Sequence, residues 1–446
     1  MPSPPDRSLF ALREFRALLG ARATNALAIS ALATVVAFQT YELTRDPLAL
    51  GWLGLVEAIP ALSLVLFGGQ VADRRERRTI VVLTSLGVTL CALLLAGLAI
   101  AGATLAGILA VIFATGIASG FERPALTALE AQVIPREDAT RGVSTLSSVS
   151  QGGAILGPAL GGLAIAVIGI PATYGVIAVL LAISTACLVT IGRKPIPAPV
   201  AGEPFVQGLL EGIRYVRRTP TLLGSMALDL FAVFFGGAIV LLPVYATDIL
   251  HVGAIGLGVL RTAPSIGALL VMLVATRRPP SRHAGRTLLV CVAGFGVSMI
   301  VFGVSTVFWV SLVALFASGV TDGISMVIRA TILRVLSPER IRGRVASVNW
   351  VFIGASNELG AFESGFAARI FGTAPSVVAG GFLTLAIVGA TAWLVPALRT
   401  LNLETAEPDD EGQTPLGALE PLPGTVDVMT VAPPTGSAGG GLTLRG

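Results

Sequence analysis

Long apolar runs, separated by short polar segments, cover most of this chain. Twelve runs reach about 20 residues, the length that crosses the apolar core of a bilayer as an α-helix. The pattern therefore predicts an all-α membrane protein with transmembrane helices at residues 18–41, 48–71, 79–101, 104–130, 143–168, 172–192, 221–248, 254–276, 286–304, 307–332, 345–369 and 376–399.

The composition supports this class and excludes others. Of the 446 residues, 54% are apolar and only 13% are charged, whereas soluble domains carry about 25% charged residues. A soluble globular protein, a disordered chain and a nucleic-acid-binding domain are therefore excluded. The three cysteines and two histidines are scattered singly, so we expect no disulfide framework, metal site or cofactor.

The basic residues orient the chain. By our count, 24 of the 30 Lys and Arg residues follow or precede spans on one side, and only Arg45 lies on the other. The positive-inside rule then places both termini in the cytoplasm. The first apolar run is a full span, so we expect no cleavable signal peptide.

Composition also divides the chain into segments. We expect a cytoplasmic N-terminal segment (1–17), a six-helix half (18–192), a cytoplasmic linker (193–220), a second six-helix half (221–400) and a disordered cytoplasmic tail (401–446). The linker contains FVQGLLEGIRYVRR (205–218), where Phe205, Leu209, Ile213 and Val216 share one helical face. This predicts an amphipathic helix on the inner membrane surface.

The two halves resemble each other at an almost constant offset. LLGARATN (18–25) aligns with LLGSMALD (222–229) at an offset of 204, and Gly116, Gly120 and Pro135 align with Gly319, Gly323 and Pro338 at 203. Chance similarity of apolar text is the alternative. A parallel repeat of two six-helix halves is typical of transporters that rock one half against the other.

A charged loop follows the second span as GGQVADRRERR (68–78). Gly68 and Gly69 predict a close approach of two helices, and Asp73 is placed to accept hydrogen bonds from a neighbouring helix N-terminus and so lock one conformation. The alternative is a stop-transfer cluster that only sets topology.

A glycine-rich segment, GGAILGPALGG, lies in the fifth span. Gly157 and Gly161 are one turn apart and predict packing against a helix of the other half, while Pro158 allows a bend. Ordinary packing of small residues between helices is the alternative.

These two segments resemble signatures of the major facilitator superfamily. The loop matches at Gly69, Asp73, Arg74, Arg77 and Arg78 but has Glu76 in place of a glycine. The second half has Arg277 where the Asp would stand, so the resemblance implies an inner gate from the first half only. The fifth span matches the superfamily's antiporter motif at Gly153, Gly157, Pro158, Gly161 and Gly162.

Two further stretches narrow the resemblance. FERPALTALEAQVIP (121–135) and IRGRVASVNWVFIGASNELGAFESG (341–365) are similar to the drug and siderophore exporters related to the enterobactin exporter. In this superfamily the first, fourth, seventh and tenth spans line the central cavity. The resemblance therefore implies a substrate and proton cavity formed by Arg22, Asn25, Glu122, Arg123, Asp229, Asp322 and Arg329.

Ionisable residues inside spans are costly and indicate function. The cavity group is predicted to form a polar wall and inner gate, with a static salt-bridge network as the alternative. Glu57 and Arg261 occupy equivalent positions and are candidates to pair when the outer side closes. Glu358 and Glu363 are five residues apart and point to different faces; Glu358 is a candidate proton site, and Glu363 is expected to meet an arginine or the outer vestibule.

Together these features predict a multi-pass inner-membrane exporter of a small amphipathic molecule, a siderophore or drug, driven by proton antiport. We expect a monomer that is not an enzyme, with a small-molecule substrate, protons and the lipid bilayer as its partners. A proton-linked importer and a non-transporting membrane sensor are the alternatives. Asp229 is the foremost proton candidate, because the equivalent residue is Asn25; the alternative is an ion pair with Arg22 or Arg123.

Overall fold

The structure, a computed structural model, describes residues 9–196, 205–275 and 283–403. The chain divides into two units, Met1–Pro408 and Asp409–Gly446. Most of the predicted disordered tail, part of the Pro-rich linker and the loop residue Arg277 lie outside the described residues.

The described residues form helices joined by short connections, with no strand among them. Short 3₁₀ and π segments are labelled η. The elements are η1 (Leu9–Ala11), α1 (Arg13–Thr44), α2 (Pro47–Arg74), α3 (Arg77–Ala101), α4 (Leu105–Val133), η2 (Arg136–Asp138), α5 (Ala139–Val189), α6 (Phe205–Arg218), α7 (Pro220–Gly236), η3 (Ala238–Leu241), α8 (Leu242–Val244), η4 (Tyr245–Ile249), α9 (Gly253–Ala275), α10 (Ala284–Val304), α11 (Phe308–Leu336), α12 (Arg342–Phe371), α13 (Thr373–Leu394) and α14 (Pro396–Thr400).

The predicted spans are confirmed within a few residues. Ten segments are long and apolar enough to cross a membrane. One of them contains two predicted spans, because α5 is interrupted at Gly169, where φ is 76°. Its two arms run in opposite directions, since Leu146 and Leu188 lie in the same apolar cluster. Helix α12 has 30 residues and is the remaining predicted span; its charged side chains set it apart from the others.

The seventh predicted span is not a continuous α-helix. Helix α7 stops at Gly236, and η3, α8 and the π-helix η4 continue the crossing to Ile249. We call Pro220–Ile249 span 7. The sequence gives a physical reason for the break: Gly236 and Gly237 weaken a helix, and Pro243 lacks an amide donor.

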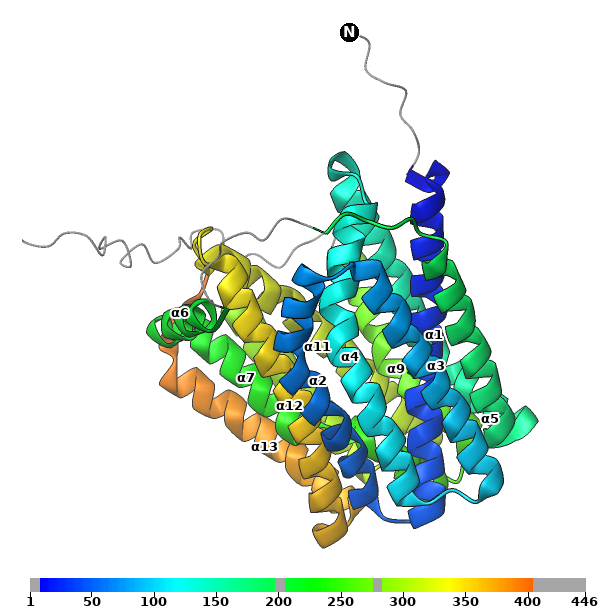
Figure 1. The fold of residues 1–446 in the computed structure, drawn as a ribbon. Coiled ribbons are helices and arrows are strands. Elements are labelled where there is room, and N and C mark those ends of the chain that lie inside the picture. Colours follow the sequence, from blue (N-terminus) through cyan, green and yellow to red (C-terminus); the bar gives the residue numbers. More distant parts are fainter. Residues whose placement is uncertain (1–8, 197–204, 276–282, 404–446) are drawn as a thin grey trace, which may run out of the picture. The chain divides into compact units, whose positions relative to one another are not determined.

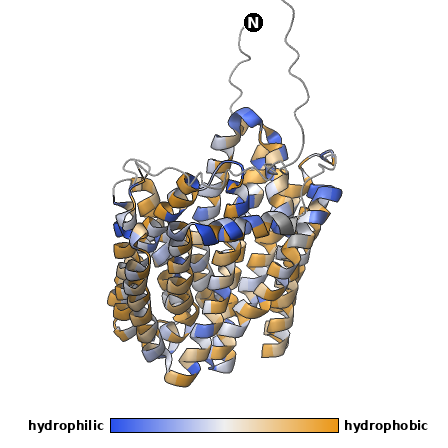
Figure 2. Cartoon of the chain, turned by 90° about the vertical axis from the view of Figure 1, so that its left-hand side faces the viewer, coloured by the Kyte–Doolittle hydropathy of each residue, from blue (hydrophilic) through white to orange (hydrophobic). Residues whose placement is uncertain are grey.

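The outer surface of the bundle is apolar along its length. Large side chains such as Leu90, Val290 and Trp393 are exposed over more than half of their area. Figure 2 shows hydrophobic helices along the sides and hydrophilic residues gathered toward one end, where a polar helix lies across the bundle. A surface of this kind is suited to contact with lipid.

The two ends of the bundle differ in charge and in contacts. The arginine-rich end holds the connections α2–α3 and α11–α12, and the Arg45 end holds the connection α1–α2. The predicted amphipathic helix is present as α6 and lies at the arginine-rich end (Figure 1). There Tyr215 donates to the Leu336 carbonyl (2.5 Å), and Glu211 pairs with Arg340 (3.1 Å) and Arg344.

The first half (α1–α5) and second half (α7–α14) meet through α2 with α12 and through α5 with α9. Between α2 and α12, Pro47 and Gly51 lie against Gly365, and further along Leu62 lies near Gly354. Between α5 and α9, the contact extends from Gly162 to Pro158 of α5. These contacts therefore lie between the Arg45 end and the middle of the spans.

Candidate transport site

The second half holds a charge cluster between α7 and α11. Arg329 forms ion pairs with Asp229 and, at 3.5 Å, with Asp322. Its Nε also donates to the Ser325 carbonyl (3.4 Å). Asp229 is buried with 8% of its area exposed, whereas the Asp322 side chain is half exposed. The alternative drawn from the sequence, an ion pair of Asp229 with Arg22 or Arg123, is not found among the described residues; its partner, Arg329, comes from its own half.

The first half holds a separate pair between α1 and α4. Arg22 lies 3.1 Å from Glu130, a residue that the sequence analysis did not select. The sequence did indicate Glu130, because it follows Glu122 by eight residues and so lies near the same face of α4. Asn25, the repeat counterpart of Asp229, has no hydrogen-bond partner among the described residues.

Three carboxylates lie within electrostatic range of Arg123 without direct ion-pair contact: Glu57, Glu122 and Glu358. Glu122 lies within range of Arg22 as well, and Glu57 also acts on Glu358. Glu358 lies against α2, since a β-carbon added to Gly54 would be 2.8 Å from its Oε2. We call Arg123 and these three carboxylates the Arg123 cluster; Glu358 brings the second half into it.

Arg261 on α9 faces the other half. Its guanidinium donates to the Ala33 carbonyl of α1 (3.2 Å), and no carboxylate within the described residues pairs with it. The candidate pair between Glu57 and Arg261 is not formed among the described residues; Arg261 instead donates to the backbone of α1. Arg261 is therefore a cation without a counter-charge at the contact between the halves.

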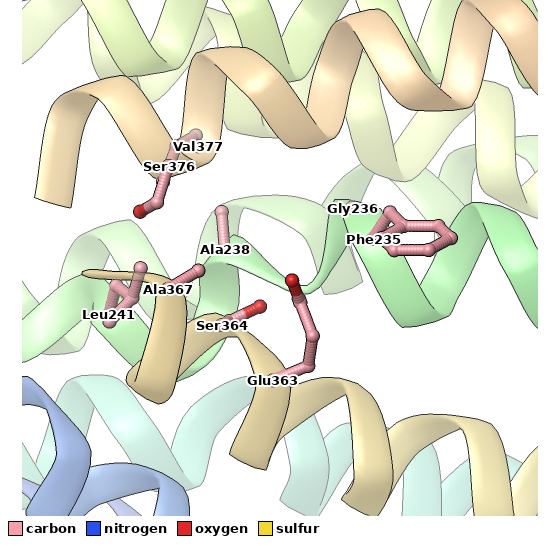
Figure 3. Close-up of a pocket in the computed structure, with 9 residues that line it drawn as sticks. All are labelled: Phe235, Gly236, Ala238, Leu241, Glu363, Ser364, Ala367, Ser376 and Val377. Carbon is pink, nitrogen blue, oxygen red and sulfur yellow. The ribbon is translucent and has the colours of Figure 1, made fainter. Parts of the chain in front are cut away.

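Glu363 points away from the Arg123 cluster. It lines a small pocket between the break in span 7, α12 and α13 (Figure 3). None of the described arginines pairs with it. The expectation that Glu358 and Glu363 point to different faces is confirmed.

The glycine-rich motif packs mainly within its own half. β-carbons added to Gly153, Gly157 and Gly161 would meet Ala26, Ser30 and Ala31 of α1. The prediction of a partner from the other half is wrong for Gly157 and Gly161. A partner from the other half is found on the neighbouring face of α5, where Gly162 and the Pro158 carbonyl both lie against Gly258 of α9. On α5, Gly153, Gly157 and Gly161 form the face that packs on α1, and Gly162 and Pro158 form the adjacent face that packs on α9.

The charged loop is open in this structure. A β-carbon added to Gly68 would collide with the Gly120 carbonyl and lie 3.0 Å from the Phe121 α-carbon, whereas one at Gly69 would meet nothing within 4 Å. Asp73 is largely exposed and lies 3.9 Å from Arg77 in its own loop, without the predicted helix N-terminus as partner. Arg74 is also exposed. Arg77 and Arg78 bind carbonyls of Ala128 (3.3 Å) and Val189 (2.5 Å).

The Arg45 end is closed by polar contacts between the halves. Tyr41 donates to Asp248, and Arg45 lies 2.9 Å from the same carboxylate. Arg369, at the end of α12, lies 2.7 Å from Asp46. We call these five residues the outer latch, a name that follows the orientation predicted from the basic residues. The sequence analysis missed it, although Arg45 was singled out as the only cation between spans on its side.

A helical bundle with twelve crossings and paired charges buried inside the spans defines a multi-pass membrane transport protein rather than an enzyme. The sequence profile of the Major Facilitator Superfamily matches residues 18–282. The chain therefore belongs to this superfamily.

Curated relatives resemble most of the chain. The enterobactin exporter EntS of Salmonella typhimurium is 27% identical over 337 residues, which cover 74% of this chain and 80% of the relative. EntS of Shigella flexneri is 25% identical over 387 residues, which cover 85% of this chain and 91% of the relative.

Solved structures show the same fold. A bacterial homologue of the human lysosomal transporter Spinster, inward-facing and unoccupied, superposes with a TM-score of 0.69 at 14% identity, covering 86% of this chain and 97% of that one. A peptide transporter of the POT family superposes with a TM-score of 0.71 at 14% identity, covering 89% of this chain and 97% of that one.

Proposed function

We propose that the chain exports a small amphipathic molecule of the siderophore class across the inner membrane by proton antiport and alternating access. The similarity to enterobactin exporters over most of the chain supports the substrate class and the direction. The two halves, residues 18–192 and 221–400, act as the moving bodies.

The distribution of charge gives the orientation. The arginine-rich end faces the cytoplasm under the positive-inside rule, and so do both termini. Because the contacts between the halves lie at the Arg45 end and the middle, this conformation is closed to the outside and open to the cytoplasm. An exporter loads its substrate in this state.

Arginines without carboxylate partners are suited to bind an anionic or catecholate group. Arg22 and Arg329 are engaged in ion pairs, and Arg123 lies among the carboxylates of its cluster, which leaves Arg261 for the substrate. Hydrogen bonds from a guanidinium group to an anion are among the stronger polar contacts. The apolar lining of the spans suits the aromatic rings of such a molecule.

The Arg123 cluster carries the proposal of proton coupling. Three carboxylates around one guanidinium leave an excess of negative charge inside the membrane, which protons neutralise. Glu358 comes from α12 of the second half, while Glu57, Glu122 and Arg123 belong to the first. Movement of the halves therefore changes the electrostatic balance of the cluster and so its proton occupancy. The proposal includes a monomer, since the two six-helix halves of one chain supply both moving bodies.

Transport in inside-out vesicles tests the function, with enterobactin as the probe. An exporter accumulates the probe inside such vesicles when the lumen is acidic, and dissipation of the pH gradient stops this. An importer depletes it instead. A sensor binds the probe but shows no counterflow in liposomes.

The substrate role of Arg261 has its own test. Arg261→Gln is expected to raise the KM for the probe about tenfold or more, from the loss of a charge-assisted hydrogen bond. Arg399→Gln, at an exposed arginine of α14, is the matched control and leaves KM unchanged. An unchanged KM in Arg261→Gln would remove this residue from the substrate site.

A further inference from the structure

Glu363 lies beside the break in span 7. Figure 3 shows its carboxyl group rising from α12 toward the chain between Gly236 and Ala238, with the Ser364 hydroxyl in the same space. The pocket has a volume of about 10 Å³ for the centre of a water-sized sphere. That is room for about one water molecule or an ion of similar size.

Within residues 9–196, 205–275 and 283–403, no positive side chain forms an ion pair with this carboxylate. Helix α13 and η3 contain no charged residue, and the only charged residue of α7, Asp229, binds Arg329. On α12 itself, Glu358 lies against Gly54, and Arg369 binds Asp46. A lone carboxylate at membrane depth is costly unless a cation compensates it.

Further oxygen atoms lie next to the pocket, on the side of Ser364. A β-carbon added to Gly237 would lie 3.3 Å from Ser364 Oγ, 3.3 Å from the Val233 carbonyl oxygen and 3.5 Å from that of Gly360. Helix α7 ends here, and Gly237 donates no capping hydrogen bond to its last carbonyls. A helix C-terminus carries partial negative charge, and half-helix C-termini with unwound carbonyls bind Na⁺ or protons in transporters.

The internal repeat shows that the second half alone has these groups. At an offset of 203, Gly157 and Gly360 align, and both pack on the helix that starts their half, α1 and span 7. Gly162 and Gly365 also align, and both face the opposite half. Between them, Leu160 and Gly161 are replaced by Glu363 and Ser364. The unbroken α1 therefore faces apolar residues, and the broken span 7 faces a carboxylate and a hydroxyl.

We propose that this pocket is a binding site for one monovalent cation, either Na⁺ held by Glu363, Ser364 and the carbonyls at the end of α7, or a proton held on Glu363. The outer part of span 7 carries Asp248 of the outer latch. Cation binding at the break stabilises the bend of span 7 and with it the closed Arg45 end.

Thermal unfolding of the purified protein in nanodiscs tests the site without any substrate. Melting temperatures are measured in NaCl against choline chloride at equal ionic strength, at pH 6 and pH 8.5. A sodium site raises the melting temperature by roughly 2 °C at ten times its dissociation constant, with a larger rise at pH 8.5. A proton site gives a higher melting temperature at pH 6 without a sodium effect.

Variants locate the effect. Glu363→Gln is expected to abolish the sodium or pH response, and Ser364→Ala to weaken the apparent affinity about tenfold. Gly237→Ala keeps every charge and fills the space with a methyl group, so it serves where Glu363→Gln does not fold. Glu339→Gln, an exposed acid between α11 and α12 that lies outside the pocket and outside the Arg123 cluster, is the matched control and retains the pocket's response.

Two outcomes would overturn the proposal. One is a wild-type protein without any sodium or pH response. The other is a response that persists in both Glu363→Gln and Gly237→Ala. Export of the probe in vesicles is measured separately, so either outcome leaves the proposed transport function standing.

Discussion

Span 1 and span 7 are repeat counterparts with different structures. Helix α1 runs unbroken over 32 residues, whereas span 7 changes from α to 3₁₀, α and π geometry after Gly236. Asn25 in the first corresponds to Asp229 in the second, and Tyr41 to Tyr245. The two spans share a repeat pattern and each carries an ion pair, through Arg22 in span 1 and Asp229 in span 7, but only span 7 bends.

The difference assigns separate tasks to the halves. Helix α1 offers a straight face to the glycines of α5, which favours a rigid first half. Span 7 binds Arg329 near its start, bends beside Glu363 in the middle and ends at the outer latch. We therefore expect changes in charge along span 7 to act on the contact at the Arg45 end.

The largest expected difference between the two spans is the loss of stability when Asp229 is replaced, compared with replacement of its counterpart Asn25. Asp229→Ala leaves the buried guanidinium of Arg329 with only its longer contact to Asp322, and we expect a loss of about 3 kcal/mol in the free energy of unfolding. Asn25→Ala, which removes no partner, is expected to change it by less than about 1 kcal/mol. Denaturation in mixed micelles measures both. Equal losses would show that the two spans are energetically alike.

The next effect concerns the packing of α5 on α1. Gly157→Leu is expected to insert into the membrane but to arrest transport, since its side chain would collide with Ser30 and the Leu27 carbonyl. Overpacking of this kind costs about 1–3 kcal/mol. Gly152→Leu is the matched control, because a β-carbon there meets nothing within 4 Å. Normal efflux in Gly157→Leu would mean that α1 is not held by this face.

The smallest effect separates the two tyrosines. Tyr41→Phe removes a hydrogen bond between the halves, and Tyr245→Phe removes one within the second half, to the Gly303 carbonyl (3.1 Å). Each bond contributes roughly 1 kcal/mol. We expect Tyr41→Phe to increase the fraction open at the Arg45 end about fivefold, and Tyr245→Phe to change thermal stability instead. Distances between spin labels across that end measure the first effect; equal distance distributions in the two variants would contradict it.

The sequence predicts the fold well because spans depend on local hydrophobicity alone. It predicts Asp322 and Arg329 on one face, and the ion pair confirms this. It does not predict the partner of Asp229, because Arg329 is 100 positions away and the choice of partner depends on how α7 packs on α11. The partner of Gly157 was wrong for the same reason: spacing defines a face but not the helix that covers it.

Other features had readable signals. Gly236, Gly237 and Pro243 mark the break in span 7, and Arg45 marks the outer latch. The pocket at Glu363 is different, because it depends on the carbonyls of α7, which become available only once the helix has ended. Glu363 alone does not indicate a cation site, and neither does the break in span 7; only the two together do.

Proton coupling at the Arg123 cluster is the central claim, and Glu358→Gln tests it most directly. The same proteoliposomes are assayed for counterflow of enterobactin and for accumulation driven by a pH gradient. Glu339→Gln, which changes an exposed acid between α11 and α12, is the control. We predict that Glu358→Gln retains counterflow and loses gradient-driven accumulation, while the control retains both. Gradient-driven accumulation at the wild-type rate in Glu358→Gln would contradict the claim.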